Sequence, residues 1–104
     1  MIQPNLAVQA DVIDQTIRLA ALKVPGVARI ARGGAAWRAR LEGRALVTRQ
    51  RDRKLDVRIW IVARPGIALG PLAASVQAAV VGAVQQLLGL ESGSVTVLID
   101  GVGG

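Results

Sequence analysis

The sequence has 104 residues, 52% of them apolar, and a formal net charge of +6 without a single histidine or cysteine. This length fits one domain, residues 1–104, and the apolar content is sufficient for a core. The missing cysteine excludes disulfides and thiolate nucleophiles, and the missing histidine removes the commonest general base and metal ligand near neutral pH. We therefore expect a non-catalytic domain with no cofactor, no metal site and no small-molecule substrate.

The positive charge is concentrated in the middle of the chain. Residues 29–64 hold eleven basic residues against three acidic ones, whereas residues 1–28 are balanced and residues 65–104 carry −2. An anionic partner should therefore meet the middle segment. The first residues, Met1-Ile2-Gln3-Pro4, include no basic stretch, so we expect no secretory signal and a cytoplasmic location.

The amino-terminal pattern predicts a short strand and then a helix. Leu6 and Val8 alternate with polar neighbours, as in an edge strand. Asp11 is a candidate N-cap, with Asp14 in the first turn, where the helix dipole favours an anion. Apolar residues follow at helical spacing: Ile13, Ile17, Ala20 and Val24. The pair Pro25-Gly26 should end this helix.

Three strands are predicted in the middle of the chain, over residues 27–30, 37–48 and 55–64. Residues 49–54 form a polar hairpin tip between the last two. The strand over residues 55–64 alternates most strictly and has one fully apolar face. Trp60 falls on its other face beside Arg58, and we expect it to be half-buried.

A second helix and a last strand complete the pattern. Gly70-Pro71 starts the helix and Gly89 closes it, and its core stripe comprises Leu72, Val76, Val80, Ala83, Val84 and Leu87. The last strand covers residues 95–99, and residues 101–104 should fray. We predict an α+β fold of order β-α-β-β-β-α-β, a single-layer mixed sheet with two helices on one face.

Residues 67–90 contain no charged side chain, which raises the alternative of a membrane span. Three glutamines, Pro71 and Gly82 within the segment favour a buried amphipathic helix instead. The helix face opposite the core stripe is uncharged, and it comprises Ala74, Ala78, Val81, Gly82 and Gln85. We expect this face, centred on Ala78, to bind a protein partner or a second copy of the chain.

A second candidate interaction surface is basic. It comprises Arg49, Arg51, Arg53, Lys54 and Arg58. An anionic protein, a lipid surface and a nucleic acid all fit this charge. Proteins that bind single-stranded nucleic acids usually stack the bases on aromatic side chains, and here only Trp60 could be such a stacking platform. Nucleic-acid binding therefore stays as the alternative to a protein-interaction role.

The carboxylates and serines offer no convincing active site. Asp11 and Asp14 suit a helix start, and arginines surround Asp52 and Asp56, which should keep both ionised. Asp100 is the remaining candidate carboxylate. No histidine exists to activate the serines, Ser75, Ser92 and Ser94.

Three segments, residues 12–27, 57–66 and 88–102, together resemble the bacterial alkaline shock protein family. The first ends in a Val-Pro-Gly-Val turn, the second joins a hydrophobic strand to a Pro-Gly turn, and the third closes on Gly-Val. The family usually has asparagine where Thr96 stands, and its second helix is usually rich in charge.

This resemblance implies a small cytoplasmic protein without known enzymatic activity, linked to cell-envelope stress. It also implies self-association, and for some members recruitment to the membrane by a separate anchoring protein. Other members look connected to the regulation of lipid synthesis.

Overall fold

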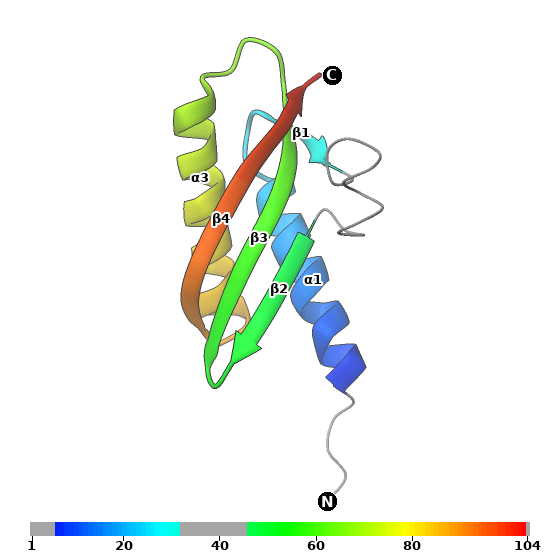
Figure 1. The fold of residues 1–104 in the computed structure, drawn as a ribbon, viewed down its shortest axis with the longest axis vertical. Coiled ribbons are helices and arrows are strands. Elements are labelled where there is room, and N and C mark those ends of the chain that lie inside the picture. Colours follow the sequence, from blue (N-terminus) through cyan, green and yellow to red (C-terminus); the bar gives the residue numbers. More distant parts are fainter. Residues whose placement is uncertain (1–5, 32–45, 104) are drawn as a thin grey trace, which may run out of the picture.

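The central element of the fold is the long strand β3 (Lys54–Ala63), which the alternating pattern predicted. The computed structural model describes residues 6–31 and 46–103. The other elements follow in chain order (Figure 1): α1 (Leu6–Leu22), β1 (Val27–Ile30), β2 (Leu46–Arg51), α3 (Leu69–Gly82), the π-helical turn η1 (Ala83–Leu87) and β4 (Glu91–Val102). The predicted α+β class is confirmed, with the order α-β-β-β-α-β.

The sheet is mixed, because β3 pairs antiparallel with β1 and β2 and parallel with β4. Strand β4 runs along the whole of β3, so β1 and β2 must share the opposite edge. Strand β2 pairs with residues 54–59 of β3, and β1 pairs with residues 61–63. The two short strands therefore lie end to end, and the backbone N–H of Ala31 donates to the Trp60 carbonyl close to the junction.

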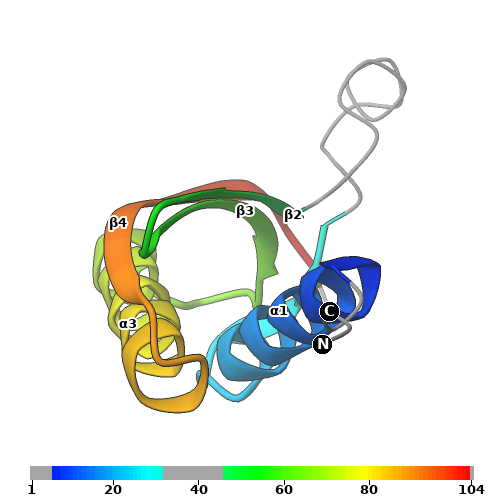
Figure 2. The ribbon, with the colours of Figure 1, turned by 90° about the horizontal axis from the view of Figure 1, so that it is seen from below.

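Both helices cover one face of this sheet, as predicted (Figure 2). The face of β3 that points toward them carries aliphatic side chains, with Ile59 and Ile61 fully buried. Ile17 from α1 and Val76 from α3 close the core from the helix side. Alternation then directs Lys54, Asp56, Arg58, Trp60 and Val62 to the opposite face, called the outer face below.

The prediction for the amino terminus was wrong. Residues 6–8 belong to α1 and not to an edge strand, and Asp11 and Asp14 lie within the helix instead of at its start. The physical reason is visible in the spacing, since Leu6, Ala10 and Ile13 continue the helical repeat of Ile17 backward. The two aspartates therefore cannot cap the helix.

Two predictions near the carboxyl terminus also need correction. Leu87 is 72% exposed although it was assigned to the core stripe, because the wider π-helical turn of η1 rotates it away from the sheet. Strand β4 does not fray after residue 100, since Val102 pairs with Ala63 and the Gly103 N–H donates to the Ala63 carbonyl at 2.8 Å.

The hairpin between β2 and β3 is tighter than predicted. Arg49 and Arg51 are strand residues, and the turn itself contains only Asp52 and Arg53. The part of the predicted strand over residues 37–45 lies outside the described residues. None of the helices within residues 6–31 and 46–103 is long and apolar enough to cross a membrane.

Candidate functional site

The predicted basic residues gather on the outer face near the β2–β3 hairpin. Cross-strand pairing sets Arg49 opposite Asp56, Arg51 opposite Lys54, and Val47 opposite Arg58. Directly opposed residues of antiparallel strands point to the same face. Arg49, Arg51, Lys54 and Arg58 are exposed and lie together there, while Arg53 extends from the turn. The name basic face is used below for these five residues.

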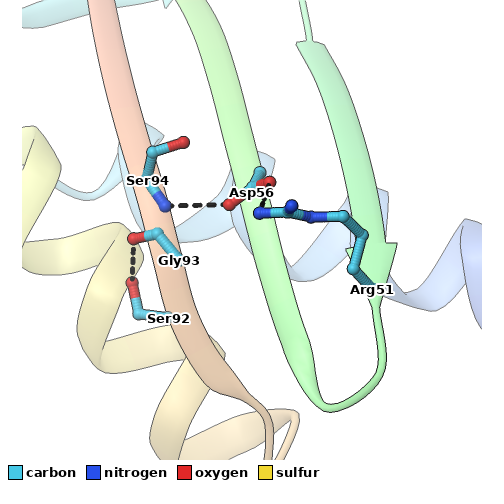
Figure 3. Close-up of polar contacts among 5 residues, drawn as sticks. All are labelled: Arg51, Asp56, Ser92, Gly93 and Ser94. Atoms are coloured by element: carbon cyan, nitrogen blue, oxygen red, sulfur yellow. Dashed lines mark hydrogen bonds and ion pairs between the residues drawn. The ribbon is translucent and has the colours of Figure 1, made fainter.

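One of these arginines is held in place by a carboxylate. The Arg51 guanidinium lies 2.9 Å from the Asp56 carboxylate, and the Ser94 backbone N–H donates to the same carboxylate at 2.9 Å (Figure 3). The Ser94 N–H is the main reason that the pKa of Asp56 lies below its ordinary value, and the Arg51 charge adds to the effect. Partial desolvation opposes both. Asp56 thus links the three strands β2, β3 and β4.

An irregularity in β4 makes this contact possible. The pairing of β3 with β4 shifts between Leu55 and Val57, so that Gly93 and Ser94 both lie opposite Asp56. A Cβ atom on Gly93 would overlap the Asp56 carboxylate and would lie 3.3 Å from the Leu55 carbonyl oxygen. Only glycine therefore lets the carboxylate reach the Ser94 N–H. Sequence reasoning missed this role, although a lone glycine in a strand pattern often marks a bulge.

The basic face borders two open hollows. A hollow of about 270 Å³ is lined by Arg49, Arg58 and the rims of β3 and β4, including Ser94 and Thr96. A second hollow of about 410 Å³ lies beside the turn, where Asp52 and Glu91 accompany Arg51, Arg53 and Lys54. The two carboxylates offset part of the positive charge at the turn. The carboxylate that lines the strand hollow, Asp56, is already paired with Arg51. The stronger anion-binding character therefore lies on the strands, around Arg49 and Arg58.

The other half of the outer face is apolar and closed. Trp60 is only 3% exposed and packs with Ala28, Ala31, Val62 and Leu98. Its indole N–H is buried and has no hydrogen-bond partner among the residues that the structure describes. The expectation of a half-buried tryptophan was wrong, and so Trp60 cannot offer a ring face on which a base could stack.

The predicted face of α3 is narrower than the sequence suggested. Ala74, Ala78 and Gln85 are exposed, but Val81 and Gly82 are half-buried, and Val81 packs against the core. Gln77 beside them donates to the Val95 carbonyl of β4 at 2.9 Å. The exposed part of this face is therefore small and flat.

The candidate carboxylates are distributed over three elements and one turn: Asp11 and Asp14 on α1, Asp52 in the β2–β3 turn, Asp56 on β3 and Asp100 on β4. Within the described ranges no three acidic side chains come together as a metal-binding group would require. Ser75 lies on α3, and Ser92 and Ser94 lie on β4.

A family model described as having a cell envelope-related function matches residues 2–103, which is almost the entire chain. That model is the one for alkaline shock protein 23. The chain belongs to the alkaline shock protein 23 family. The resemblance seen in the three sequence segments is thereby confirmed. A search of curated proteins found no match to the chain.

Among solved structures, this family member is similar to the CTD of MamM. The nickel form of that domain aligns with a TM-score of 0.65 at 20% identity, over 88% of this chain and 96% of the other. A double alanine variant gives 0.66 at 20%, over 89% and 94%. A methionine-to-leucine variant gives 0.60 at 19%, over 89% and 98%. At this identity the likeness shows a shared fold and nothing more.

The family's Val-Pro-Gly-Val turn has a clear structural reason in this member. Gly26 has φ of 100°, a conformation that residues with a side chain rarely adopt. A Cβ atom there would lie 3.1 Å from a Leu72 methyl group and 3.2 Å from one of Ile67. The turn therefore brings α1 close to the start of α3 and directs β1 onto the edge of β3.

Proposed function

We propose that this domain is a non-catalytic interaction module of the cell envelope that binds an acidic protein partner through its basic face. The observation that carries the proposal is the cross-strand arrangement of arginines on the sheet face that the helices leave uncovered. The cell envelope-related function of the family supports the cellular setting.

The chemistry of the basic face suits carboxylates. An arginine guanidinium presents paired N–H donors that match the two oxygens of a carboxylate. Arg49 and Arg58 are exposed on neighbouring strands, with the Thr96 side chain beside them on β4. An extended acidic segment lying across β2, β3 and β4 could meet these groups in turn. The partner that we propose is a membrane-anchored protein, which would hold the domain at the membrane face in the cytoplasm.

A nucleic acid is the competing partner, because basic charge alone attracts phosphate as well. The burial of Trp60 argues against a single-stranded binder that stacks its bases. Charge without an aromatic platform is more typical of a surface that recognises carboxylates or headgroups. Both alternatives enter the experiment as separate arms.

The test reverses two charges on the basic face with Arg49→Glu and Arg58→Glu, and leaves Arg51 in its ion pair. Envelope proteins are captured with the wild-type chain from the native cell, and binding to acidic liposomes and to mixed-sequence RNA is measured beside them. We expect one captured acidic membrane protein to be lost with the variant. Its binding to the wild type should weaken as salt rises, since exposed charges are screened over about 8 Å at physiological ionic strength.

A matched control reverses two charges elsewhere, with Arg29→Glu and Arg64→Glu, both exposed positions away from the hairpin and from helix α1. The control should keep the partner. Equal capture by wild type, variant and control would contradict the role of the basic face. Tight RNA binding that is lost only with the basic-face variant would favour the nucleic-acid alternative.

A further inference from the structure

Helix α1 has a second apolar stripe that the other described elements, within residues 6–31 and 46–103, leave exposed. Three large side chains on it are exposed to solvent: Val12 by 49%, Leu19 by 58% and Leu22 by 44%. They are spaced seven and three residues apart, the spacing of one helix face. Single exposed apolar residues are ordinary, but three in line on one helix indicate a contact surface.

The stripe points directly away from the core. Ile13, Ile17 and Ala21 face the sheet and α3. At 100° per residue, Leu19 lies about 160° around the helix from Ile17, and Val12 and Leu22 flank it. Gln15 completes the outward face. The helix is therefore apolar on two opposite sides, one buried by its own fold and one left outside.

The charges of α1 are divided between its two halves. Asp11 and Asp14 lie in the first half, and Arg18 lies in the second, with Lys23 directly after the last turn. A partner helix with the same division would be attracted in the antiparallel direction, where each acidic half meets a basic half. In the parallel direction like charges would meet.

We propose that this stripe binds the same stripe of a second copy of the chain. The two helices would run antiparallel about a two-fold axis that crosses the exposed side of α1 at the level of residue 17. The pairing is self-consistent, since positions equally far from residue 17 face each other: Val12 meets Leu22, and Gln15 meets Leu19 of the other copy. A two-fold interface requires this kind of self-complementarity. The proposal rests on the proposed scaffold role, to which it adds a homotypic surface distinct from the basic face.

Other occupants fit the stripe less well. A helix that lies on an anionic membrane carries basic residues along the borders of its apolar face. Here the borders carry both signs, with Asp11 beside Arg18 at one border and Lys23 at the other. The apolar stripe also spans only three large side chains. The exposed face of α3 offers alanine and glutamine, which give a partner little apolar area to bury. The α1 stripe is therefore the stronger homotypic surface of the two helices.

The experiment measures the molar mass of the full chain by light scattering over a dilution series. We expect a wild-type dimer, and for Leu19→Glu at least a tenfold increase in the dimer Kd with an unchanged circular dichroism spectrum. Ala78→Glu tests the α3 face that the sequence pointed to. It should leave the α1-mediated dimer intact.

Charge exchange gives a readout that does not depend on the Leu19 variant folding. Asp11→Lys alone and Lys23→Asp alone should each raise the Kd a few-fold, and the two together should return it toward the wild-type value.

A monomeric wild type at all concentrations would overturn the proposal. So would a dimer that Ala78→Glu dissociates and Leu19→Glu does not. The dimer should survive the basic-face variant, and Leu19→Glu should still bind the acidic partner, so failure of one proposal can be told from failure of the other.

Discussion

The outer face of β3 has two halves that differ completely although one regular strand carries both. In the first half, Asp56 and Arg58 meet water, and the residues paired with them on β2 are Arg49 and Val47, both exposed. In the second half, Trp60 and Val62 are buried at 3% and 5% exposure among apolar side chains of β1 and β4. The change occurs where β3 exchanges its edge partner from β2 to β1.

The contrast indicates that the neighbouring strand, and not the alternation, decides whether the outer face is charged and exposed or apolar and buried. The inner face of β3 is apolar from end to end because both helices press on it. Within residues 6–31 and 46–103 no helix lies on the outer face, so each half takes the character of the strand beside it. Binding to charged partners is then confined to the half beside β2, and stability depends on the half beside β1.

The largest expected effect separates the two halves directly. Trp60→Ala should destabilise the domain by about 3–5 kcal/mol, because a large buried aromatic side chain leaves a cavity. Arg58→Ala, two residues earlier on the same face, should stay within about 0.5 kcal/mol, as is usual for exposed positions. Chemical denaturation of both variants measures the contrast. Similar losses of unfolding free energy for the two variants would contradict the distinction between a buried half and an exposed half of the outer face.

Trp60→Phe refines this prediction. The variant keeps most of the aromatic contact and removes a buried indole N–H that no residue in the ranges 6–31 and 46–103 accepts. Its cost should therefore be much smaller than that of Trp60→Ala. A phenylalanine variant as unstable as the alanine variant would indicate that the N–H contributes through a contact that the fold does not show.

Local pattern was sufficient for much of the fold. The alternation of residues 55–63 fixed β3, and the repeat of Leu72, Val76, Val80 and Val84 gave the buried side of α3, since helix and strand periods are local properties. The assignment of Leu87 to the same buried stripe was wrong, because a π-helical turn changes the period within the helix. The helical repeat also extended to Leu6, where a two-residue alternation had suggested a strand.

The basic face was predictable in composition but not in arrangement. Six consecutive polar residues indicated a hairpin tip, and Arg58 was expected on the strand after it, but Arg49 and Arg51 were assigned to the tip and not to β2. The partner of Asp56 could not be predicted, because Ser94 lies 38 residues away and meets it only when β4 pairs with β3. The burial of Trp60 was missed for a similar reason: alternation assigns a side chain to a face but does not say what packs on that face.

A smaller effect is expected where the charged half meets β4. Gly93→Ala should cost about 1–3 kcal/mol, because the added methyl group forces the Asp56 carboxylate away from the Ser94 N–H and approaches the Leu55 carbonyl. Gly101→Ala on the same strand is the matched control, since nothing lies within 4 Å of its Cβ position. It should be neutral or slightly stabilising. Equal effects at the two glycines would show that the Asp56 contact does not depend on Gly93.

The smallest effect is the pH dependence that Asp56 gives to the charged half. Its pKa in the folded chain lies below the ordinary value of 3.8, chiefly because the Ser94 N–H stabilises the carboxylate. A lowered pKa in the folded state means that its contribution to stability is fully present above about pH 4 and is lost as the pH falls through the lower, folded value.

Asp56→Asn keeps an oxygen that can accept the Ser94 N–H but loses the ion pair with Arg51 and the proton equilibrium. The difference in unfolding free energy between wild type and variant, measured by denaturation from pH 7 to pH 2.5, should therefore be largest near neutrality and should shrink below about pH 4. The other carboxylates titrate in both proteins and cancel from this difference. Because Arg51 is exposed, the whole effect should be modest and should decrease in high salt. A difference that stayed constant across the pH range would mean that Asp56 stabilises the three strands by packing alone and not by its charge.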